Sequence, residues 1–78
     1  MMIQNINGTS ARLPSGYDSW IDFWEAKTGE TAAVGKIGGH VKKSNSTDNA
    51  WYIAAITIAE NNKVVPYVYS GKLAKLRD

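Results

Sequence analysis

The chain contains no cysteine and a single histidine, His40, in 78 residues. A domain of this size buries a modest fraction of its unfolded surface, and small domains often depend on disulfides or a structural metal for stability. Without cysteine, neither a disulfide nor a thiolate zinc site can form. The sequence therefore predicts one domain, residues 1–78, that is stabilised by side-chain packing or by a partner and that uses no metal or other cofactor.

Three Trp and four Tyr give this short chain a high aromatic content, which we expect to dominate a compact core. Residues 18–29, DSWIDFWEAKTG, are the clearest helix in the sequence. Ser19 and Asp22 resemble a capping box, and Gly29 is a typical helix stop. The aromatic side chains of this helix share one face and are expected in the core: Trp20, Phe23 and Trp24.

Short β-compatible stretches follow the helix, so residues 31–78 are predicted to be β-rich. Pro66 suggests an edge strand, and residues 72–78 fit either a last strand or a helical turn. Residues 1–17 contain Asn-Gly, Pro and Ser-Gly without sustained periodicity, which predicts an extended arm, free or docked on the body through Ile3 and Ile6. The whole pattern predicts an α+β fold in which one N-terminal helix packs on a small antiparallel β-sheet or hairpin.

The formal net charge of +2 is unevenly distributed along the chain. Residues 1–38 hold three basic and four acidic residues, whereas residues 39–78 hold six basic and three acidic residues, a net charge of +3. This excess permits a polyanion partner for the second half and argues against a protein that mimics the charge of DNA. The sequence has no apolar run long enough to cross a bilayer and no signal peptide, so we expect a cytoplasmic domain that does not contact membranes.

Four stretches of the sequence follow one another in a distinctive order: NGTSARLPSGYDSWIDFWEAKTG, GGHVKK, STDNAWYI and NNKVVPYVYSGKL. Together they resemble small bacterial and phage proteins of the HNH type, which contain a ββα unit. The resemblance covers nearly the whole chain. It implies that the β-rich part, residues 31–78, is an HNH-like domain.

Proteins of the family that this chain resembles carry two cysteine pairs that hold a structural zinc. The first pair would lie between Gly29 and His40, and the second would fall at Thr57 and Glu60; no thiol is present at either place. A zinc knuckle of that kind is therefore excluded. We expect packing to hold the hairpin instead, through the helix aromatics and three hairpin side chains: Trp51, Ile53 and Ile56.

The resemblance also implies catalytic positions. In HNH nucleases a first His activates water, a middle Asn fixes the loop that orients it, and a last His or Asn helps to bind the catalytic metal. These positions correspond here to His40, Asn49 and Asn61. Many HNH sites place an acidic metal ligand directly before the first His, where this chain has Gly39. Because hard cations favour carboxylate oxygens, we expect a relic of a catalytic site rather than a working one.

Each of these three residues also has a structural interpretation without catalysis. His40 fits a surface or hydrogen-bonded strand residue with an ordinary pKa. Asn49 fits the closing residue of a hairpin turn, and Asn61 fits a residue that interrupts regular structure.

Four lysines near the predicted hairpin are candidates for contact with nucleic acid: Lys42, Lys43, Lys63 and Lys72. They favour an inactive HNH-like domain that binds nucleic acid or a nucleic-acid-processing protein, although Lys42 and Lys43 also fit a solvated strand edge. The small size, the missing metal ligands and the many Trp and Tyr favour a phage-encoded inhibitor of a host defence nuclease, of the anti-CRISPR type, acting by protein contact. A third hypothesis is an active metal-dependent HNH endonuclease. The oligomeric state is open.

Overall fold

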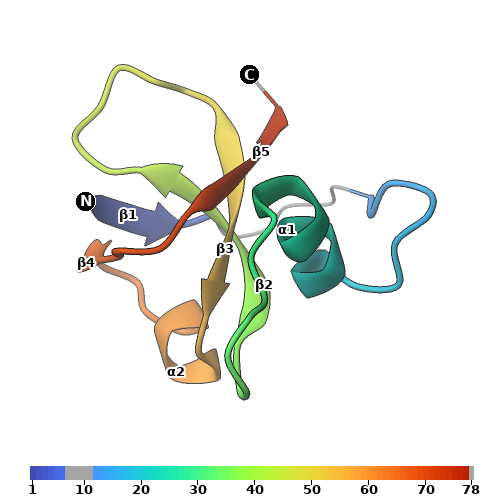
Figure 1. The fold of residues 1–78 in the computed structure, drawn as a ribbon. Coiled ribbons are helices and arrows are strands. Elements are labelled where there is room, and N and C mark those ends of the chain that lie inside the picture. The colour runs from blue at the N-terminus through green and yellow to red at the C-terminus, as the bar shows by residue number, and fades with distance from the viewer. Residues whose placement is uncertain (7–11, 78) are drawn as a thin grey trace.

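The structure, a computed structural model, describes residues 1–6 and 12–77. Within these residues it is an α+β fold in which a helix packs on an antiparallel sheet, as the sequence predicts (Figure 1). It differs from the prediction in having a second, short helix and a larger sheet. The elements in chain order are β1 (Met2–Asn5), α1 (Trp20–Thr28), β2 (Ile37–Lys43), β3 (Trp51–Ile56), α2 (Ile58–Asn61), β4 (Tyr67–Val68) and β5 (Leu73–Arg77).

The first strand lies inside the sheet, between β4 and β2. The strand order is β4-β1-β2-β3-β5, and every pairing is antiparallel. Ile3 of β1 is opposite Lys43 of β2 on one side and opposite Tyr67 of β4 on the other. The predicted extended segment 1–17 is thus docked on the body at its start, where Ile3 is fully buried and β1 pairs with strands that are distant in the sequence. Residues 7–11 of that predicted arm lie outside the described residues.

The sheet must curl, because its two outer strands are joined by a short connection. Residues 69–72 link β4 to β5, and an extended chain from Val68 to Leu73 spans at most about 18 Å. In a flat sheet, the outer two of five strands lie about 19 Å apart. Figure 1 shows the resulting bend, in which the chain passes from β4 at one edge directly to β5 at the other.

Each face of the sheet carries its own hydrophobic cluster. We call one side the inner face; its cluster is formed by side chains of β1 to β4 and of two residues that flank these strands: Ile3, Val41, Ala50, Tyr52, Ala54, Ile56, Tyr67 and Tyr69. The opposite side, the helix face, is covered by α1. Its buried cluster contains Phe23, Trp24, Ile53, Ala55 and Ala74. Successive residues of a strand point to opposite faces, so Val41 is on the inner face and its neighbour His40 is on the helix face.

Helix α1 forms as the sequence predicts. The Ser19 side chain accepts a hydrogen bond from the backbone N–H of Asp22 at 3.2 Å, and Gly29 ends the helix at φ 74° with its N–H donated to the carbonyl of Glu25. Phe23 and Trp24 are buried in the core, as predicted, whereas Trp20 is half-buried. A positive φ is adopted by glycine without steric cost, which explains the residue at this stop.

Helix α2 was not predicted, although the sequence carries a signal for it. Thr57 and Glu60 form a capping box: the Thr57 hydroxyl accepts from the Glu60 N–H, and the Glu60 carboxylate accepts from the Thr57 N–H. This Thr-x-x-Glu spacing is a typical helix start. The segment before β4 contains Pro66, and β4 is an outer strand as that proline predicts. Of the two alternatives for the C-terminal residues, the strand is correct.

Candidate functional site

A cavity of about 520 Å³ lies between the C-terminal end of α1, the start of β5 and the C-terminal end of β2. Three lysines from different elements line it: Lys27 of α1, Lys43 of β2 and Lys72 before β5. The hydroxyl-bearing residues Thr28 and Tyr52 also line it. Among the described residues around this cavity, none carries a carboxylate. We call it the lysine cavity.

Each lysine is brought there by a different structural cause. Lys27 lies in the last turn of α1, where a cation also interacts favourably with the helix dipole. Lys43 lies on the inner face, two residues after the buried Val41. Lys72 is fixed through its backbone, because its carbonyl accepts hydrogen bonds from Trp24 Nε1 at 2.8 Å and from the Tyr69 hydroxyl at 2.7 Å. The positions of the three lysines therefore depend on the hydrophobic clusters of both the inner face and the helix face.

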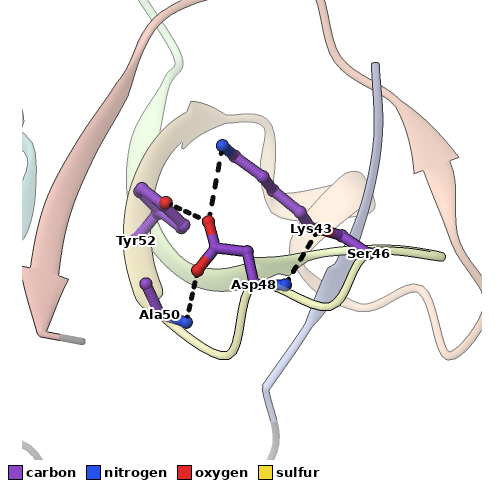
Figure 2. A network of polar contacts seen from close by, with 5 residues as sticks. All are labelled: Lys43, Ser46, Asp48, Ala50 and Tyr52. Atoms are coloured by element: carbon purple, nitrogen blue, oxygen red, sulfur yellow. Dashed lines mark hydrogen bonds and ion pairs between the residues drawn. The ribbon is translucent and has the colours of Figure 1, made fainter.

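Asp48 connects one wall of the lysine cavity to the loop between β2 and β3. Figure 2 shows its carboxylate turned toward Lys43 and Tyr52. Oδ2 accepts the Tyr52 hydroxyl at 2.5 Å and lies 3.5 Å from Lys43 Nζ, while Oδ1 accepts the Ala50 N–H at 2.8 Å. The Asp48 N–H in turn donates to Ser46 Oγ at 3.0 Å. The loop is thus ordered by one carboxylate.

These contacts decide the ionisation of Asp48. The hydrogen bond from Tyr52 and then that from the Ala50 N–H hold the pKa of Asp48 below its ordinary value of 3.8, and Lys43 adds to this effect. Hydrogen bonds to the charged form of a carboxylate stabilise that form. Asp48 is therefore an anion at neutral pH, beside a cation that lines the cavity.

The lysine cavity is suited to a phosphate-bearing anion. Lysine offers a compact positive charge with three donors, which binds phosphate as a point charge. Lys43 Nζ lies 5.1 Å from the centre of the Tyr52 ring, and Lys27 Nζ lies 5.6 Å from the centre of the Phe23 ring. The aromatic rings thus support the lysine side chains, while the ammonium groups remain near solvent.

Two of the four lysines predicted to bind nucleic acid meet at this site. Lys43 and Lys72 line the cavity, but Lys42 alternates to the other face of β2 and is exposed there. Lys63 lies between α2 and β4, with its Nζ 5.6 Å from the centre of the Tyr67 ring, and does not line the cavity. Lys27 was missed, because the sequence contains no signal that places the end of the helix beside β2.

The three predicted catalytic relics are not brought together. His40 is on the helix face, where its ring packs edge-on against Trp20 with 4.6 Å between ring centroids. Asn61 is on the inner face, since its Oδ1 lies 3.1 Å from the position that a Cβ on Gly39 would occupy. Asn49 is exposed in the loop between β2 and β3. The sheet therefore separates the residues that correspond to the catalytic base and the last metal ligand.

His40 also differs from the ordinary surface or hydrogen-bonded histidine that the sequence suggested. Its Nε2 is buried and has no hydrogen-bond partner among the described residues. Burial lowers the pKa of His40 below 6.5, because the charged imidazolium loses solvation. The side chain is a neutral, half-buried packing residue between β2 and α1.

Within residues 1–6 and 12–77, no group of three or more His, Cys, Asp or Glu side chains is placed to hold a metal ion. None of the helices in the described part is long and apolar enough to cross a membrane. The chain matches no protein-family model, no curated protein and no solved structure.

Proposed function

We propose that this protein is a non-catalytic nucleic-acid-binding domain that holds backbone phosphates in the lysine cavity. The observation that carries the proposal is the convergence of Lys27, Lys43 and Lys72 around a single cavity of about 520 Å³. Phosphate contacts of this kind supply most of the affinity of sequence-independent binding.

The aromatic residues near the cavity support phosphate contact rather than base stacking. Tyr52 is 8% exposed, and its hydroxyl is already bonded to Asp48, so its ring is not a free platform for a base. Phe23 is buried under Lys27. Binding through ammonium groups alone is tolerant of sequence, because backbone phosphates carry no direct base information.

The relation to HNH-type domains belongs to the same proposal. Strands β2 and β3 and helix α2 follow one another in the ββα order of those domains. Support for a role without catalysis comes from His40 and Asn61, which lie on opposite faces of β2 and so have no common phosphate to act on. We propose a domain that keeps the order of elements and the affinity for phosphate without the cleavage chemistry.

The test is fluorescence anisotropy with labelled single-stranded DNA, RNA and duplex DNA of equal length. Three phosphate contacts on a single strand predict a slope of about −2 for log K against log [salt]. The affinity should then fall roughly 16-fold between 50 and 200 mM salt. Replacing one of the three lysines by alanine should weaken binding and reduce the slope by about 0.7. The matched control is Lys63→Ala, which removes a lysine outside the cavity.

Two results would contradict the proposal. One is the absence of binding at 50 mM salt for all three nucleic acids. The other is an equal loss of affinity in Lys63→Ala and Lys72→Ala, since the charge would then act without regard to the cavity. Incubation of each nucleic acid with Mg²⁺ or Mn²⁺ should yield no cleavage; cleavage that disappears in His40→Ala would restore the nuclease hypothesis.

A second candidate function, contact with a nucleic-acid-processing protein, is favoured by a different surface. Residues 58–68 expose four large apolar side chains: Ile58, Val64, Val65 and Val68, which are 64%, 89%, 59% and 69% exposed. Large exposed apolar side chains, here within eleven consecutive residues, are a feature of protein interaction sites. An inhibitor of a defence nuclease would lose its partner in the double variant Val64→Ser, Val65→Ser and keep it in Lys43→Ala, Lys72→Ala.

A further inference from the structure

We infer that Asp48 sets the affinity of the lysine cavity by competing with the bound phosphate for Lys43. The inference rests on the proposed function, since it concerns the same cavity. It assigns a regulating role to a residue that does not itself line the site.

The carboxylate of Asp48 is the fixed member of the pair. Its Oδ1 is anchored by the Ala50 N–H at 2.8 Å and its Oδ2 by the Tyr52 hydroxyl at 2.5 Å, and Tyr52 is buried. These bonds come from the loop and from β3, so the negative charge stays in place whether or not Lys43 is near. Figure 2 shows both bonds converging on the carboxylate.

Lys43 is the movable member. Its Nζ lies 3.5 Å from Asp48 Oδ2, beyond the range of about 2.7–2.9 Å for a strong charge-assisted hydrogen bond. The Lys43 and Asp48 side chains are 38% and 33% exposed. Ion pairs of this exposure are weak and are screened by salt. A phosphate in the cavity can therefore draw Lys43 away from Asp48, at the cost of that weak contact.

Asp48 accordingly occupies the role of an internal anion. Without a ligand, its carboxylate oxygen takes the place beside Lys43 that a phosphate oxygen would take. A phosphate that binds must displace this carboxylate from Lys43. Removing the charge of Asp48 should free Lys43, so the affinity for polyanions should rise.

The experiment compares Asp48→Asn with the native chain in the anisotropy assay, using single-stranded DNA as the probe. Asparagine keeps an oxygen for the Ala50 N–H and removes the charge. We expect binding about three- to ten-fold tighter at 50 mM salt, with a slope steeper by up to about 0.7 because Lys43 becomes fully available. The control Asp18→Asn, an exposed Asp outside the cavity, should change the affinity less than two-fold.

A double-mutant cycle separates competition for Lys43 from a general change in charge. In a Lys43→Ala background, Asp48→Asn should lose most of its effect. An equal gain in both backgrounds would overturn the inference, because Asp48 would then act on the ligand without Lys43.

A second variant guards against disturbance of the loop in Asp48→Asn. Tyr52→Phe removes the hydroxyl that shares Oδ2 with Lys43 and leaves the Ala50 N–H to anchor the carboxylate through Oδ1, so Oδ2 should hold Lys43 more firmly and DNA should bind more weakly. Tighter binding in Tyr52→Phe would contradict the inference.

Failure of the inference and failure of the proposed function give different results. If the native chain binds no nucleic acid, both fail. If the native chain binds and Lys72→Ala weakens binding, but Asp48→Asn binds no more tightly, only the inference fails.

Discussion

The two faces of the sheet are stabilised in different ways. On the inner face every tyrosine hydroxyl has an acceptor: Tyr52 donates to Asp48, Tyr67 donates to Asn5 Oδ1 at 2.6 Å, and Tyr69 donates to the carbonyl of Lys72. The helix face is packed by aromatic rings, and there the buried Nε2 of His40 has no partner among the described residues. Buried polar groups are nearly always hydrogen-bonded. The hydrogen bonds of the inner face therefore restrict the positions of its side chains more than ring packing restricts those of the helix face.

The comparison also explains why Gly38 and Gly39 lie next to each other in β2. A Cβ on Gly38 would lie 2.5 Å from the backbone carbonyl carbon of Trp20, so α1 can approach the sheet only over a glycine. A Cβ on Gly39 would instead meet the side chains of Ile56 and Asn61 on the inner face. On the helix face, the space next to β2 is therefore limited by backbone atoms of α1. On the inner face, it is limited by side chains.

The largest expected effect is on the helix face, at Trp24. This side chain is 5% exposed, and its Nε1 donates to the carbonyl of Lys72. Trp24→Ala should cost about 3–5 kcal/mol, most of the stability of a domain this small, and leave the chain largely unfolded in circular dichroism. The half-buried Trp20, replaced by Ala, is the matched control with a smaller loss. A folded, soluble Trp24→Ala would mean that this face is not the main core.

The next effect distinguishes the two glycines. Gly38→Ala should destabilise the domain by about 1–3 kcal/mol or displace α1, because the added methyl group meets backbone atoms that cannot rotate away. Gly39→Ala should cost less, since the Ile56 side chain can adopt another rotamer. Urea unfolding of both variants measures the difference. Equal losses would show that the close approach of α1 to β2 does not limit the fold.

A smaller effect is expected from the tyrosine hydroxyls of the inner face. Tyr69→Phe removes both a donor to Lys72 and the acceptor for the Ala55 N–H, so it should cost about 1–3 kcal/mol. Tyr67→Phe removes only the bond to Asn5 and should cost about 0.5–1.5 kcal/mol. Burial, with a smaller effect of Glu60, raises the pKa of Tyr67 to about 12, so its hydroxyl should stay protonated at pH 10 as long as the chain is folded. The reverse order of the two losses would contradict this hydrogen-bond assignment.

The smallest effect concerns pH. The pKa of His40 is lowered by burial in the folded state, whereas the unfolded chain binds a proton near pH 6.5. The contribution of His40 to stability should therefore be constant above about pH 6.5 and fall as the pH drops from there toward the lower pKa of the folded state. Asp48 and Glu60, whose pKa values are lowered from 3.8 and 4.5, affect stability only at more acidic pH.

His40→Leu isolates this effect. The urea midpoint of the variant should depend less on pH than that of the native chain between pH 7.5 and 5. The same pH dependence in both proteins would mean that another group is responsible.

Local patterns in the sequence were sufficient for the elements whose cause is local. The cap at Ser19, the stop at Gly29 and the aromatic spacing between them predict α1 correctly. The Thr57 to Glu60 spacing carries the same kind of signal for α2, although it lies in a stretch that otherwise suggests a strand followed by a turn. No such signal marks β1, because four residues form a strand there only through partners about 40 and 65 residues away.

In the candidate site, too, some features follow from local sequence and others only from contacts between distant segments. Sequence alone establishes that Gly39 and His40, as neighbours on a strand, point to opposite faces. It does not establish which face α2 covers, and that choice separates Asn61 from His40. Lys43 and Lys72 could be proposed from their charge, but their meeting with Lys27 depends on the curl of the sheet.

By itself, the sequence determined that the chain folds without disulfides or a thiolate zinc site, that an aromatic helix supplies much of the core, and that positive charge lies in the second half. The tertiary structure alone decided that β1 enters the sheet, that the two outer strands approach each other, and that three lysines share one cavity. The physical reason is the range of the interactions. Caps and helical periodicity act within a few residues, whereas strand pairing and the curl arise from contacts between segments that are far apart in the chain.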